Sequence, residues 1–128
     1  AKINGNQFIR VDGILEEGDA VGDFNRITET NYNQDEFKII LNLNIIPSFG
    51  EGTYNFINTT TVNNVKIARF DPITTSYINY DTNGSLIITK KEGYIYTGTY
   101  SCTAVNPNNP NDLLQVTDGS FKLVNKFL

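Results

Sequence analysis

The sequence predicts a single all-β domain over residues 1–128, folded as an antiparallel β-sandwich or a closed barrel of about eight to ten strands. The strand-forming residues Ile (15), Thr (14), Phe (8), Tyr (7) and Val (7) are abundant, whereas Ala occurs four times. Asn (18) and Gly (10) supply the turn residues that many short strands require. We therefore expect no long helix, and the chain is long enough to bury a core without disulfides or metals.

Residues 36–46 form the clearest predicted strand. Apolar side chains occupy every second position from Phe37 to Ile45, and polar side chains such as Lys38 lie between them. Five apolar residues at a strict period of two are difficult to place on one face of a helix. Pro47 and two glycines then end this strand, and a second strand over 53–57 completes a predicted hairpin.

The remaining strands are predicted from shorter apolar runs between turn residues. They cover 24–30, 65–70, 75–80, 85–90, 94–104, 113–117 and 120–124. Asn4-Gly5 predicts a small hairpin near the start, and tight turns are predicted at 81–84 and 91–93. Longer connections are expected over 12–23 and 106–112, and these are where the sequence predicts a ligand-facing rim.

Short turns join neighbouring strands in antiparallel pairs. One apolar and one polar face per strand suit either a sandwich or a closed barrel, and the spacing of the strands does not separate the two.

The composition excludes several classes of function. The chain has no His and one Cys, which excludes Ser-His and Cys-His nucleophilic pairs, His-ligated or Cys-rich zinc sites and an intrachain disulfide. The net charge is −4 and no run of basic residues occurs, which argues against a nucleic-acid ligand. Eight of the fourteen acidic residues lie within residues 12–36, so one end of the chain is strongly negative.

The strand over 94–104 carries the candidate ligand-binding residues Tyr94, Tyr96 and Tyr100, which share one face. They either form a stacking platform for a sugar or another flat ligand, with Gly98 leaving room for its approach, or they are core rings and Gly98 marks a bend. The second interpretation is favoured, because a sandwich needs buried aromatic rings on one face. Cys102, on the same face, is interpreted as a small buried hydrophobe, since no histidine is present to activate it.

Carboxylates are the remaining candidates for chemistry. Glu16, Glu17, Asp19 and Asp23 offer enough oxygen ligands for a Ca²⁺ ion, although they lack the spacing of an EF-hand loop, and a solvated acidic loop is favoured. No other cofactor is expected. Two carboxylates could hydrolyse a glycan, and the candidates for such a pair are Glu16, Glu17, Glu29, Asp35 and Glu36. These residues lie mostly in the loop-like acidic stretch rather than on a rigid strand, so a solvated loop is favoured here as well.

Several short segments carry a resemblance to a known group of proteins. These are Ala1 to Phe8, Gly52-Thr53-Tyr54, Gly84 to Lys90, Gly98 to Ala104 and Val116 to Phe121. Together they resemble the uncharacterised secreted lipoproteins of Bacteroides-type Gram-negative bacteria, in which a Gly-Thr-Phe-Ser-Phe-x-Ala strand recurs. The resemblance implies an all-β fold, no established activity and a lipid-anchored cysteine upstream of Ala1. Cys102 departs from the pattern, because it stands where that group usually has an aromatic residue.

Three functions remain open. The first is a non-catalytic envelope or cell-surface domain that binds a glycan, a peptide or a protein partner. It would be exported to the periplasm or the outer-membrane surface and would meet a membrane only through the lipid anchor. The second is a small barrel that carries an apolar ligand in a cavity lined by Tyr94, Tyr96 and Tyr100. The third is a carboxylate-dependent glycan hydrolase. The missing catalytic residue types favour the first.

Overall fold

The computed structural model describes residues 1–7, 11–15, 37–43, 48–93 and 95–124, and the regular structure within these ranges is entirely β-strand. The all-β prediction is therefore confirmed. The strands are β1 (Lys2–Ile3), β2 (Asn6–Gln7), β3 (Val11–Leu15), β4 (Phe37–Leu43), β5 (Gly52–Phe56), β6 (Asn64–Asp71), β7 (Ser76–Glu92), β8 (Ile95–Asn106) and β9 (Asn109–Val124).

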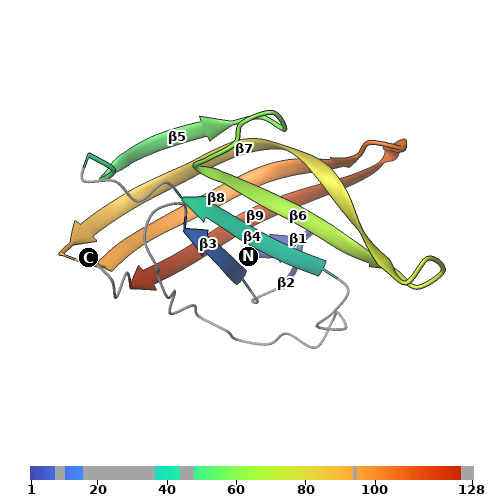
Figure 1. The fold of residues 1–128 in the computed structure, drawn as a ribbon, viewed down its shortest axis with the longest axis horizontal. Coiled ribbons are helices and arrows are strands. Elements are labelled where there is room, and N and C mark those ends of the chain that lie inside the picture. Colours follow the sequence, from blue (N-terminus) through green and yellow to red (C-terminus); the bar gives the residue numbers. More distant parts are fainter. Residues whose placement is uncertain (8–10, 16–36, 44–47, 94, 125–128) are drawn as a thin grey trace.

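The strands are joined in one path whose order is β2-β1-β9-β8-β7-β6-β4-β3, and β5 pairs with β7 beside this path. All the pairs are antiparallel except β3 with β4, which is parallel. Figure 1 shows the path bending along β7, so that β5, β8 and β9 form one layer while β6, β4 and β3 form another. In the described part of the chain β2 and β3 stand at the two ends of the path and do not pair with each other, so the sheet is not closed and the fold is sandwich-like.

Strand β7 is shared by the two layers. Its residues 76–80 pair with β6, whereas residues 81–92 pair with β8 and residues 84–88 also pair with β5. The tight turn that the sequence predicts at 81–84 is therefore wrong. Tyr80, Thr82, Leu86 and Ile88 are all buried, so the period of two continues through the expected turn.

Gly84 is needed for close packing rather than for a turn. A Cβ atom added at this position would lie 2.1 Å from the carbonyl oxygen of Ser101 and 2.5 Å from the Cβ atom of Cys102. Real Cβ atoms do not approach other atoms this closely, so only glycine allows β8 to lie against β7 here.

The connections also refine the prediction. The Asn4-Gly5 hairpin is confirmed, with φ angles of 50° and 81° at the two turn residues. Residues 12–15, expected in a loop, belong to β3, where they pair with β4. The loop expected over 106–112 is a tight turn, because Asn106 already pairs with Asn109. The two strands expected after it are one strand, interrupted by an irregularity at Asp118, whose φ angle is 54°.

The core lies between the inner faces of the two layers. The apolar face predicted for residues 36–46 is confirmed in its described part, since Phe37, Ile39, Leu41 and Leu43 are 0–3% exposed. The opposite layer contributes the inner faces of β1, β7, β8 and β9. Its members are Ile3, Leu86, Ile88, Tyr96, Tyr100, Cys102, Ala104, Leu114, Val116, Phe121 and Leu123.

Replacing Gly84 by alanine tests the close packing of β7 and β8. Gly84→Ala should lower the free energy of unfolding by about 1–3 kcal/mol, because the new methyl group displaces the backbone of β8. Urea denaturation followed by circular dichroism measures this difference. Gly50→Ala is the matched control, since the nearest atom to a Cβ there is 3.7 Å away. Equal losses in the two variants would contradict the packing described for Gly84.

Candidate functional site

Two of the three candidate tyrosines, Tyr96 and Tyr100, are buried, and the third, Tyr94, lies outside the described residues. Tyr96 is 1% exposed and Tyr100 is 3% exposed. The ring of Tyr96 lies 5.7 Å from the ring of Phe49, and the Lys91 ammonium lies 5.4 Å from its centroid. Burial raises the pKa of the Tyr100 hydroxyl. Both rings are part of the core and offer no exposed face to a flat ligand.

The space above Gly98 is filled by the protein itself. A Cβ atom at Gly98 would lie 2.4 Å from the Phe121 ring, and one at Gly119 would lie 2.5 Å from the Tyr100 ring. Each of these glycines therefore receives an aromatic ring from the neighbouring strand. This interlocking leaves no room for a ligand above Gly98.

Cys102 is a buried free thiol, 7% exposed. Burial raises the pKa of its thiol to about 12, so the thiol stays protonated near neutral pH. Nucleophilic thiols have the opposite shift, because the thiolate is the reactive form.

The predicted acidic candidates lie outside the described residues. These are Glu16, Glu17, Asp19 and Asp23, together with Glu29, Asp35 and Glu36. Within the ranges given above, no three acidic or cysteine side chains gather closely enough to hold a metal ion, and no helix is long and apolar enough to span a membrane.

A groove lies where β7 leaves β6, and we call it the fork groove. Ile67 and Tyr80 are the last residues paired between these strands on this side. Beyond them the strands separate, and the Thr82 hydroxyl donates a hydrogen bond to the Val65 carbonyl at 2.7 Å. Two adjoining hollows of about 540 and 300 Å³ open here, and both are lined by Asn58, Asp81 and Thr82.

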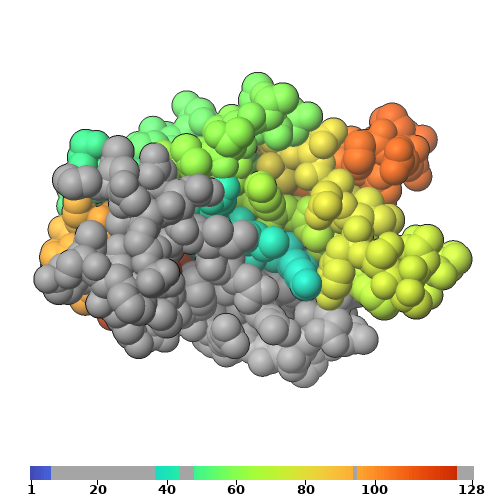
Figure 2. Space-filling view, viewed as in Figure 1, coloured from blue at the N-terminus to red at the C-terminus, as the bar shows by residue number. Residues whose placement is uncertain are grey.

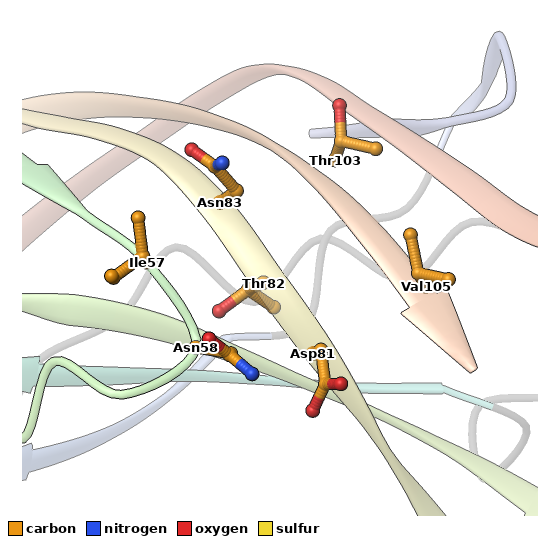
Figure 3. A pocket seen from close by; sticks show the side chains of 7 residues that line it. All are labelled: Ile57, Asn58, Asp81, Thr82, Asn83, Thr103 and Val105. Atoms are coloured by element: carbon orange, nitrogen blue, oxygen red, sulfur yellow. The ribbon is translucent and has the colours of Figure 1, made fainter. Parts of the chain in front are cut away.

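The larger hollow of the fork groove is lined mainly by polar side chains (Figure 3). Asn83 on β7 and Thr103 on β8 are strand partners, and their side chains project to the same side of the sheet. The side chains of Ile57 and Val105 project to that side as well. Asn58, Asp81 and Asn83 are exposed, and Ile57 is 52% exposed. The groove therefore presents amide, carboxylate and hydroxyl groups beside two apolar side chains.

Two buried asparagines fix the loop that carries Ile57 and Asn58. Asn42 and Asn64 are partners on β4 and β6, and they are 4% and 3% exposed. The Asn42 Nδ2 donates to the Thr61 carbonyl at 2.6 Å, and the Asn64 Nδ2 donates to the Thr60 carbonyl at 2.5 Å. Their Oδ1 atoms are buried without a donor from the described residues, so the pair stabilises the loop through its amide N–H groups.

A second hollow, of about 510 Å³, lies at the end of the sandwich and is called the end cleft. Its lining residues come from the β6–β7 hairpin and from the start of β9. They are Arg69, Phe70, Asp71, Pro72, Ile78, Tyr80 and Asp112. Asp112 belongs to the range 106–112, where the sequence predicts a ligand-facing rim, but the sequence predicts neither hollow as a whole because each brings together residues from separate strands.

Comparisons of this chain with models of protein families, with curated proteins and with solved structures find no match. The geometry of the two hollows is therefore the basis for assigning a function.

Asn64→Ala tests the fixing of the loop. The substitution removes the donor to the Thr60 carbonyl and should lower the free energy of unfolding by about 1 kcal/mol. Amide hydrogen exchange should accelerate at Thr60, whose N–H donates to the Ile57 carbonyl. Asn79→Ala is the control, because Asn79 is an exposed strand residue. Unchanged exchange at Thr60 in Asn64→Ala would refute the role given to the asparagine pair.

Thiol labelling tests the burial of Cys102. At pH 8 the native chain should react with Ellman's reagent at least about 100-fold more slowly than a variant that carries its cysteine at the neighbouring exposed position, Ser101→Cys with Cys102→Ala. In concentrated urea the two chains should react at similar rates. Rapid labelling of native Cys102 would contradict its raised pKa and its place in the core.

Proposed function

We propose that the chain is a non-catalytic binding domain of an exported envelope protein, and that the fork groove binds a glycan. The observation that carries the proposal is the set of exposed hydrogen-bonding side chains, Asn58, Asp81 and Asn83, around a hollow of about 540 Å³. Binding sites of this size use a few placed polar groups to orient a ligand and apolar contacts to hold it.

The chemistry of the lining residues matches that of a sugar. Amide side chains both donate and accept hydrogen bonds, and a carboxylate accepts two, so together they pair with neighbouring sugar hydroxyls. The hydroxyl of Thr103 donates its hydrogen to the Gln115 Oε1 at 3.3 Å, and its oxygen adds a further acceptor. Ile57 and Val105 provide apolar surface for the C–H groups of the sugar ring.

The same lining favours binding over hydrolysis. Of the described residues that line the two hollows of the fork groove, Asp81 is the only carboxylate. Glycoside hydrolysis ordinarily needs two, at a defined separation across the scissile bond. One carboxylate can still orient a ligand, because hydrogen bonds to a charged acceptor are stronger than neutral ones.

The alternative of an apolar ligand inside a barrel has less support. It needs a closed sheet and an unfilled face at Tyr96 and Tyr100, whereas both rings are buried and the described strands leave the sheet open. An exposed polar groove is therefore the better candidate for the binding site.

A glycan array probed with the intact chain, followed by titration calorimetry with the strongest glycan, tests the proposal. Asn83→Ala should weaken binding about fivefold, which corresponds to the loss of one hydrogen bond of about 1 kcal/mol. Asp81→Asn should weaken binding by a similar factor, because a neutral acceptor replaces a charged one. Asn55→Ala should leave the affinity unchanged, because this exposed residue of β5 lies outside the groove. An array without a bound glycan, or equal affinities in all the variants, would overturn the proposal.

A further inference from the structure

We propose that the end cleft is a second binding site, which accepts the basic side chain of a lysine or arginine from an extended peptide segment of a partner protein. The inference does not rest on the fork groove or its glycan, although Tyr80 lines both the end cleft and the smaller hollow of the fork groove. The inference is carried by three features of the cleft: its position at the open end of the core, its fixed carboxylates and its apolar wall.

The cleft is the end of the space between the two layers. Arg69 pairs with Ile78 and Ile67 pairs with Tyr80, so these four side chains lie on the core face of β6 and β7. Asp112 lies on the inner face of β9, two residues before the buried Leu114. The β6–β7 and β8–β9 hairpins form two separate lobes at this end of the molecule (Figure 2). A side chain that enters between them reaches polar groups at the base of the cleft.

Two carboxylates are fixed in the cleft by neutral donors. Asp112 accepts hydrogen bonds from the Tyr80 hydroxyl at 2.6 Å and from the Asn106 Nδ2 at 3.2 Å, and both use its Oδ2 atom. Asp71 accepts a hydrogen bond from the Ile73 N–H at 2.9 Å through its Oδ1 atom. These donors orient the carboxylates without cancelling their charge. The second oxygen of each can therefore accept an N–H group of a ligand.

The charge balance of the cleft favours a cation. Its lining holds two carboxylates and one guanidinium, that of Arg69, which leaves one negative charge in excess. Burial, followed by the hydrogen bond to Asp112, raises the pKa of Tyr80, so this hydroxyl remains a neutral donor near neutral pH. An anionic ligand would meet two like charges and one opposite charge, whereas an ammonium or guanidinium group would meet two carboxylate acceptors and one like charge, that of Arg69.

The wall of the cleft suits the stem of a basic side chain. Phe70, Pro72 and Ile78 supply apolar surface, along which the methylene groups of lysine or arginine can pack while the charged head reaches the carboxylates. An exposed apolar residue stands near the cleft as well, since Ile73 is 92% exposed at the tip of the β6–β7 hairpin. It can contact an apolar neighbour of the basic residue in a peptide, which a free amine lacks.

Nuclear magnetic resonance titration with blocked tetrapeptides tests the inference. A peptide with a central lysine beside an isoleucine should shift the amide signals of residues 69–80 and 112–113. Its affinity should fall at least fivefold when norleucine replaces the lysine, and a glutamate peptide should not bind. Tighter binding of the glutamate peptide would mean that Arg69 selects an anionic ligand, and it would overturn the proposal. Equal binding of the norleucine and lysine peptides would overturn it as well.

Two variants locate the site. Asp112→Asn and Asp71→Asn should each weaken the lysine peptide at least fivefold, and the spectrum of the free variant reports whether it is folded. Asp71→Asn serves as the test if Asp112→Asn does not fold, because Asp71 contacts only the hairpin turn among the interactions given above.

The matched control is Asp118→Asn, which changes an exposed acid on the same strand as Asp112 and should bind as the wild type does. Equal affinity of Asp71→Asn and Asp118→Asn would contradict the site. Glycan binding is measured separately, so failure of one proposal leaves the other standing.

Discussion

The pairing of β7 with strands of both layers is the constraint on which the rest of the structure depends. A strand of 17 residues that changes partners must satisfy its backbone on both sides of the change. Beyond Tyr80 the pairing with β6 ends, and the Thr82 hydroxyl contacts the Val65 carbonyl at the point of separation. Two residues later Gly84 brings β8 close enough to continue the ladder. The bend and the two layers follow from this sequence of contacts.

Both hollows are products of the same bend. The fork groove opens where β6 and β7 separate, and the end cleft opens where their hairpin extends beyond the core. Their chemistry differs because different elements complete them. A loop held by two buried asparagines adds neutral polar groups to the first, whereas β9 adds the carboxylate of Asp112 to the second. One scaffold thus supports two sites that recognise different ligand chemistry.

The sequence was most informative where one face of a strand is buried. The alternation of apolar and polar residues predicted the inner faces of 37–43 and of 96–104, because burial imposes a period of two. It failed at 81–84, where Asp-Thr-Asn-Gly has the composition of a turn although Thr82 continues the buried face. The glycine signals a close approach between strands as readily as a turn, and composition alone does not distinguish the two.

The candidate site was less predictable than the fold. Asn42 and Asn64 are polar residues of a kind that usually faces solvent on a strand. They are buried because the loop that carries Thr60 and Thr61 folds over them. The fork groove brings together residues 57–58, 81–83 and 103–105. These residues are distant in sequence, so no local sequence pattern predicts the groove. Tyr96 and Tyr100 were candidates for ligand binding because they are large aromatic residues on one face of a strand. Residues of a β-sandwich core have the same two properties, so the pattern does not separate the two roles.

Cross-strand nuclear Overhauser effects along β7 test the continuity of this strand most directly. A continuous strand predicts contacts between Asp81 and Val105 and between Asn83 and Thr103, together with the contact between Arg69 and Ile78 in the same chain. Contacts between Asp81 and Gly84 across a tight turn, with the Asn83 to Thr103 contact absent, would contradict the continuous strand and both hollows derived from it.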